Sequence, residues 1–71
     1  MKSDIKDYIV DNFKDDDISV IKDAIIESIN DNDEVALPGL GIFFLLNWEV
    51  CSDKEKDMIV ERIYNQIKKG N

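Results

Sequence analysis

The sequence predicts an all-α protein, a small bundle of about four short helices forming a single domain over residues 1–71. Three observations predict this fold. Apolar residues recur at the three- and four-residue spacing of a helix in three separate segments. A helix-capping motif precedes the last of them, and a continuous apolar block lies between the second and the third. A chain this short buries only about 60% of the surface that it exposes when unfolded, so it can build one core but not two.

The first helix is expected from about Asp4 to Phe13. Its apolar face consists of Ile5, Tyr8, Ile9 and Phe13. A second helix is expected to follow the polar segment 14–17, in which Asp16 or Asp17 is placed to cap it, and to run to about Ile29. Its apolar stripe consists of Ile18, Ile21, Ile25 and Ile29. The composition of segment 30–33 is typical of a turn.

The last helix has the clearest boundaries. Ser52 and Glu55 have the spacing of a capping box, in which each side chain satisfies a backbone amide of the other residue. The apolar residues behind it recur at helical spacing: Ile59, Val60, Ile63, Tyr64 and Ile67. Lys68 and Lys69 suit the negative end of the helix, and Gly70 is expected to end it.

The middle segment allows two structures. In the first, residues 42–50 form a short, mostly buried helix after the Pro-Gly-x-Gly break at 38–41, and Pro38 itself is suited to a first helical position. In the second, residues 34–37 and 42–45 pair as strands of a central hairpin around Pro38–Gly41, which gives an α+β fold. Periodicity does not separate the two, because residues 42–46 are all apolar. We favour the helix, because a small sheet with two apolar faces would need two cores.

Charge is spread unevenly along the chain. Residues 1–37 carry four Lys against eleven Asp and Glu, and residues 38–71 balance five basic against five acidic groups, so the formal net charge of −7 arises in the first half. Lys68 and Lys69 form the only basic pair. Because phosphate backbones require clustered cations, the composition argues against direct nucleic-acid binding.

The residue types exclude most chemistry. The sequence has no His, which removes catalytic triads and most zinc sites. The acidic segments beginning at Asp15 and Asp31 lack residues that a calcium loop requires, and Gly39-Leu40-Gly41 lacks the third Gly of a dinucleotide fingerprint. We therefore predict no enzyme activity, no cofactor, no metal and no small-molecule substrate.

The ends and the single cysteine bear on the compartment. No apolar run approaches the roughly 20 residues of a membrane span. The start, Met1-Lys2-Ser3-Asp4, includes an acid, whereas a signal peptide would need a basic end and an apolar stretch. Cys51 has no second cysteine within the chain to pair with. We therefore expect a soluble cytoplasmic protein that does not enter a membrane.

The central segment holds the candidate interaction residues. They comprise the motif Leu37, Pro38, Gly39, Leu40, Gly41 and the large apolar residues Phe43, Phe44, Leu46 and Trp48. In one interpretation the large residues simply form the core. In the other they exceed what four short helices can cover, and the surplus favours a homodimer or a protein partner.

The same segment resembles the small acid-soluble spore protein I family of endospore-forming bacteria. The matching pieces, in order over about residues 18–69, are Ile21–Ile25, Asp33-Glu34, Leu37–Gly41, Ile42–Phe44, Trp48 and Ser52–Glu55 with the helix behind it. Leu45-Leu46-Asn47 and segment 14–17 depart from the family pattern, which indicates a divergent member. The resemblance implies a non-enzymatic protein of the forespore and spore core, with no assigned molecular role.

Another resemblance is to the histone-like DNA-bending proteins. Segments 17–19, 23–26 and 33–41 are similar to their two helices and the Gly-x-Gly hairpin that follows. Those proteins continue into long basic arms, whereas this chain continues into Asn47–Val50 and a helix of mixed charge. This resemblance therefore implies a relative that lacks the DNA-binding arms.

Overall fold

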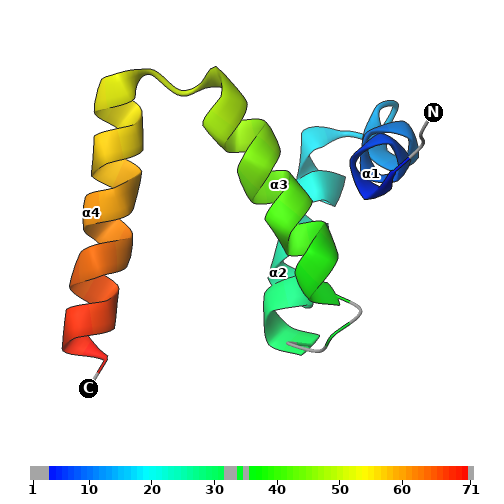
Figure 1. Ribbon diagram of the computed structural model, residues 1–71. Coiled ribbons are helices and arrows are strands. Elements are labelled where there is room, and N and C mark those ends of the chain that lie inside the picture. The colour runs from blue at the N-terminus through cyan, green and yellow to red at the C-terminus, as the bar shows by residue number, and fades with distance from the viewer. Residues whose placement is uncertain (1–3, 32–33, 35, 71) are drawn as a thin grey trace.

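The computed structural model describes residues 4–31, 34 and 36–70, and these residues form four helices. They are α1 (Ile5–Phe13), α2 (Ile18–Asp31), α3 (Ala36–Val50) and α4 (Asp53–Lys69). No strand occurs among the described residues, so the all-α prediction is confirmed. Figure 1 shows α1 and α2 on one side of α3, while α4 runs back in the opposite direction on the other side and diverges from α3 below the turn that joins them.

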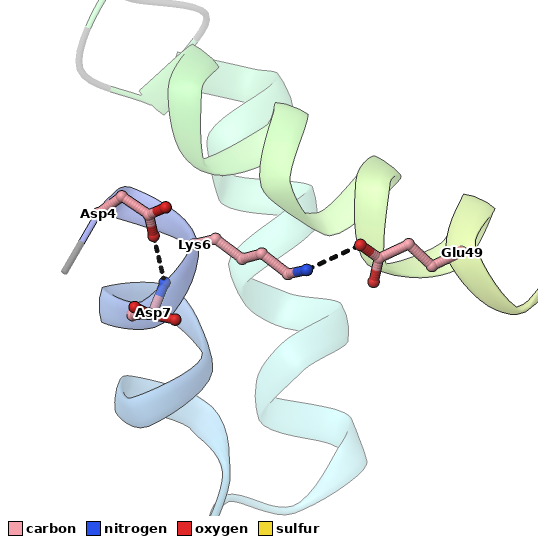
Figure 2. Close-up of polar contacts among 4 residues, drawn as sticks. All are labelled: Asp4, Lys6, Asp7 and Glu49. Carbon is pink, nitrogen blue, oxygen red and sulfur yellow. Dashed lines mark hydrogen bonds and ion pairs between the residues drawn. The ribbon is translucent and has the colours of Figure 1, made fainter. Parts of the chain in front are cut away.

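Both N-terminal helices begin at an aspartate. The Asp4 carboxylate accepts a hydrogen bond from the Asp7 amide at 3.1 Å and caps α1 (Figure 2). Before α2, the Asp17 carboxylate accepts from the Ser19 amide at 3.1 Å and from the Ser19 hydroxyl at 2.6 Å. The predicted cap of the second helix is therefore confirmed, with Asp17 in that place. These two hydrogen bonds from Ser19 lower the pKa of Asp17 from its ordinary value.

The Asp17 cap gives a pH prediction. The pKa of Asp17 is lower in the folded protein than its ordinary value of 3.8 in the unfolded chain. The ionised carboxylate therefore stabilises the folded protein fully above pH 3.8, and this stabilisation is lost as the pH falls through the folded-state pKa. We expect the difference in free energy of unfolding between wild type and Asp17→Asn to shrink below that pH, because the amide oxygen caps at every pH. Urea unfolding at a series of pH values measures it, and a constant difference would contradict the assignment.

A helix replaces the proposed turn and hairpin in the middle of the chain. Asn30 and Asp31 still belong to α2, while residues 32–33 of the expected turn lie outside the described part. Helix α3 runs from Ala36 to Val50, so the predicted helix over residues 42–50 is confirmed but begins six residues earlier than expected, with Pro38 in its first turn. Pro38 fits there because the first amides of a helix have no acceptor within it. The central-hairpin alternative is therefore wrong for the described residues.

The Pro-Gly-x-Gly segment was also misread as a break, because both of its glycines lie inside α3. Glycine lowers helix stability through the freedom of its unfolded backbone. A Cβ on Gly39 would lie 3.8 Å from the Ile9 Cδ1 atom, an ordinary contact, and a Cβ on Gly41 would meet nothing within 4 Å. Neither glycine is therefore required by packing within the monomer.

Gly41→Ala is expected to stabilise the protein by about 0.5–1 kcal/mol, because it removes the glycine penalty and fills open space. Thermal unfolding followed by circular dichroism measures the gain. Gly70→Ala is the control: its Cβ would lie 3.1 Å from the Gln66 carbonyl oxygen, so the same change should bring no gain there. A loss of stability in Gly41→Ala would show that another group approaches this position.

The capping box of α4 is confirmed. The Glu55 amide donates to the Ser52 hydroxyl oxygen at 3.1 Å, and the Ser52 amide donates to the Glu55 carboxylate at 2.8 Å. Asp53 and Glu55 lie in the first turn, and Lys68 and Lys69 lie in the last, so both ends match the helix dipole. The helix ends at Gly70, as predicted.

Ser52→Ala is expected to lower the free energy of unfolding by about 1 kcal/mol, because it leaves the Glu55 amide without its acceptor. Urea unfolding of both proteins measures the loss. Ser52→Asp should retain most of the stability, since its carboxylate can accept the same hydrogen bond. Equal losses in the two variants would show that the cap contributes little.

Packing is centred on α3, which contacts both α1 and α2. The rings of Phe13 and Phe43 meet edge to face with centroids 5.5 Å apart. An ion pair between the Lys6 ammonium and the Glu49 carboxylate, 2.7 Å apart, joins α1 to the far end of α3 (Figure 2). The hydrogen bond and the charge of Glu49 raise the pKa of Lys6. Both side chains are substantially exposed, so this pair orients α1 more than it stabilises the fold.

Candidate interaction surface on α3 and α4

Helix α4 follows α3 after a tight turn but stands away from it, so it is scarcely covered (Figure 1). Every α4 side chain is exposed except Lys56 and Ile59, which are half-buried and belong to its first two turns. Trp48 stacks on Phe44, one turn earlier in the same helix, with centroids 5.7 Å apart and planes at 30°, and it also makes the contact with α4. The Lys56 ammonium lies 5.3 Å from the centre of the Trp48 ring. The contact is therefore concentrated near the turn that joins the two helices.

Beyond Trp48 the two helices enclose an open groove of about 750 Å³, here called the α3–α4 groove. Phe44 and Asn47 line it from α3. The lining from α4 and the residue that follows it consists of Ile59, Arg62, Ile63, Gln66, Ile67 and Gly70. The three isoleucines follow one another at four-residue spacing, so one apolar row of α4 faces the groove.

A smaller hollow of about 490 Å³ adjoins the groove on the other side of Phe44. It is lined by Ile25 and Ile29 of α2 and by Leu40 and Phe43 of α3, and it shares Phe44 and Asn47 with the groove. A continuous apolar surface therefore runs from α2 across Phe44 to α4.

The predicted interaction residues divide into two groups. Leu40, Phe43, Leu46 and Trp48 are half-buried, as is Gly39, which lies close to Ile9 of α1. The exposed group consists of Leu37, Pro38, Gly41 and Phe44. Of the four large residues, Phe43 packs on Phe13 whereas Phe44 is 43% exposed and lines the groove. Binding through these residues remains a prediction.

Sequence reasoning missed the contribution of α4 to this surface. From the sequence, Ile59, Ile63 and Ile67 were recognised only as apolar residues at helical spacing in the last helix, and they were not among the predicted interaction residues. In the structure Ile63 is 46% exposed and Ile67 is 62% exposed. The stripe was visible in the sequence, but nothing local to it indicates whether the rest of the chain is large enough to cover it.

The surface offers packing more than reactive groups. Among the described residues, no three His, Cys, Asp or Glu gather in a way that could hold a metal ion. The Cys51 thiol is half-buried and lies 3.5 Å from the side-chain oxygen of Asn47. None of the helices in the described part is long and apolar enough to cross a membrane.

Comparison with known proteins identifies the family. The family model described as small, acid-soluble spore protein I matches residues 3–67. The chain belongs to the small acid-soluble spore protein I family. The resemblance found in the sequence is thus confirmed, and the match also includes segment 14–17, which lay outside it. No solved structure matches this spore protein.

Curated relatives carry the same family description. A small acid-soluble spore protein I of Halalkalibacterium halodurans is 29% identical over 63 residues, which cover 89% of this chain and 93% of the relative. One from Bacillus velezensis is 25% identical over 68 residues, 96% of each chain. One from Bacillus cereus is 31% identical over 49 residues, 69% of this chain and 71% of the relative. The match therefore extends over nearly the whole length of a relative.

The likeness to histone-like DNA-bending proteins does not extend to the fold of the middle segment. Those proteins would require a hairpin after the second helix, and residues 36–50 of this spore protein form α3 instead. A charge balance of five basic to five acidic residues in 38–71 also replaces their basic arms.

Proposed function

We propose that this protein is a non-enzymatic component of the spore core, made in the developing forespore and retained in the mature spore. The match of the family model over residues 3–67 carries the proposal. The residue types support the non-enzymatic part, because a chain without His lacks the commonest acid–base group. The net charge of −7 favours a role other than coating DNA.

A time course in the source organism tests this proposal. An antibody to the protein is used on samples taken through growth and starvation, and on forespore and mother-cell fractions. The protein is expected only in the forespore and afterwards in the mature spore. Steady presence in growing cells, or absence from purified spores, would contradict the proposal.

A second function, binding of another protein chain through the α3–α4 groove, is favoured by the exposed surface. The chain exposes 5916 Å², whereas a compact monomer of 8.2 kDa is expected to expose about 4,500 Å². Among the described residues no side chain is fully buried. Helix α3 is apolar on nearly all sides, and such a helix is normally covered all round.

The size of the native protein in a spore extract tests this binding role. Gel filtration of the extract should place the wild-type protein in a species larger than 8.2 kDa. Phe44→Asp, which puts a charge in the groove, should move it to the size of one chain. If the wild-type protein already elutes as one chain, the binding role is wrong, whatever the result for spore localisation.

A further inference from the structure

We propose that the α3–α4 groove is filled by α4 of a second copy of this chain, so that the protein is a two-fold symmetric dimer with its two α4 helices antiparallel. This inference rests on the binding role proposed above and names its partner. Four features carry it: the area that the monomer leaves exposed, the apolar row on α4, the charges at the ends of α4, and the spacing of the row.

The exposed area matches what a stable dimer needs. The Cα radius of gyration is 13.8 Å, whereas a compact domain of this length has about 11 Å. The excess of roughly 1,400 Å² over a compact monomer exceeds the ~800 Å² per partner of a standard interface. Two copies that covered this excess would bury roughly 2,800 Å² together, within the range of obligate homodimers.

The groove and its proposed occupant have the same chemistry. The row Ile59, Ile63 and Ile67 lines the groove from one side, and it is also the face that an approaching α4 would bring. A surface that both lines a groove and fills the matching groove of its copy is self-complementary, as a two-fold interface requires. Phe44 is exposed where the groove meets the smaller hollow between α2 and α3. It would cover the side of the incoming α4 that faces away from the first copy's own α4.

Charge fixes the direction of the pair. The start of α4 alternates Asp53, Glu55 and Asp57 with Lys54 and Lys56, whereas its last turn holds Lys68 and Lys69 without an acid. In an antiparallel pair each basic end lies near the mixed-charge start of the partner helix, where acids outnumber bases by one, and the helix dipoles oppose one another. A parallel pair would set the two Lys68-Lys69 ends against each other and align the dipoles. The charges therefore favour the antiparallel arrangement.

The spacing of the row fixes the register. In an antiparallel pair the middle residue of a row meets its own copy near the two-fold axis, so Ile63 is expected to face Ile63 of the second copy. Ile67 would then face Ile59. The two copies of Ile67 would be separated by eight residues, or about 12 Å along the helix axis.

Sedimentation equilibrium of the purified protein gives the first test. The wild type is expected at twice the 8.2 kDa mass of one chain, and Ile63→Asp at the mass of one chain. Tyr64→Asp is the matched control, because Tyr64 is 57% exposed on the same helix but does not line the groove. It should remain a dimer. A wild-type monomer, or dissociation of Tyr64→Asp, would overturn the proposal.

Cysteine cross-linking gives a second test that does not depend on a disruptive change. In a Cys51→Ser background, Ile63→Cys should form an intermolecular disulfide on mild oxidation. Ile67→Cys should not, because about 12 Å exceeds the ~7 Å Cα separation that a disulfide can span. Cross-linking at both positions would indicate a parallel pair, and cross-linking at neither would show that α4 of a second copy does not fill the groove.

The two proposals can fail separately. If the purified protein is a monomer but the spore extract contains a larger species that Phe44→Asp dissociates, then self-association is wrong and the groove binds a different chain. If both measurements give one chain, the binding role fails as well. Neither result alters the family assignment, which rests on residues 3–67.

Discussion

Phe43→Asp is expected to leave the protein unfolded at 25 °C. Phe43 is half-buried and its ring contacts Phe13, so this residue joins α1 to α3. Truncating a half-buried phenylalanine costs about 2 kcal/mol, less than the ~3–5 kcal/mol of a fully buried one, and a carboxylate placed against Phe13 adds the cost of removing a charge from water. A single core of this size supplies only about 3–5 kcal/mol of net stability, so the combined loss is as large as the stability available. Circular dichroism should show loss of most helical signal.

Phe44→Asp is the matched control, because it introduces the same charge one residue further along α3. Phe44 is 43% exposed and lines the α3–α4 groove, so its carboxylate can remain in water. We expect this variant to keep its helical signal while it loses association. Unfolding of both variants to the same extent would show that Phe44 belongs to the core, and retention of structure in Phe43→Asp would contradict the packing of α1 on α3.

Trp48→Ala is expected to lower the free energy of unfolding by about 2 kcal/mol and to release α4 from α3. Trp48 is half-buried, so the loss is smaller than the ~3–5 kcal/mol of a fully buried Trp. Its ring stacks on Phe44 within α3 and lies beneath the Lys56 ammonium of α4, and the contact with Lys56 joins the start of α4 to α3. Urea unfolding gives the energy, and nuclear Overhauser effects between the two helices report their separation.

Trp48→Phe tests whether the aromatic ring itself is responsible. A phenyl ring can still stack on Phe44 within α3 and can still face Lys56 of α4, so this variant should keep the contact between the two helices and lose less stability. If Trp48→Ala keeps the same inter-helix contacts as wild type, Trp48 is not the joint between the two helices.

Helix existence and helix ends were readable from the sequence wherever the signal was local. The stripe from Ile5 to Phe13, the aspartate before α2 and the Ser52–Glu55 capping box all depend on residues within one or two turns, and each appears in the structure as predicted. These signals act on the backbone directly, so the rest of the chain has little power to change them.

The sequence was less informative where packing overrides local preference. Gly39 and Gly41 are poor helix residues, yet they lie inside α3. The apolar block that follows them packs against α1 and α2, and this packing stabilises a helix that includes both glycines. Pro38 is compatible with this only because it falls in the first turn.

The candidate site could be predicted only in part. The apolar surplus around Phe44 is visible in the sequence, because so short a chain cannot cover it. The separation between Phe43, which packs on α1, and Phe44, which lines the groove, depends on the placement of α1 and α4 around α3. The contribution of Ile63 depends on α4 standing away from the bundle, which no local pattern encodes.

The most direct test of the account is hydrogen exchange of the α4 amides as a function of protein concentration. The central claim is that the apolar row of α4 is exposed in a single chain and is covered by α4 of a second copy. Protection of residues 59–67 should therefore rise with concentration more steeply than that of α1, which lines neither the groove nor the adjoining hollow. Protection of α4 that is independent of concentration, in a protein that remains monomeric, would contradict the claim.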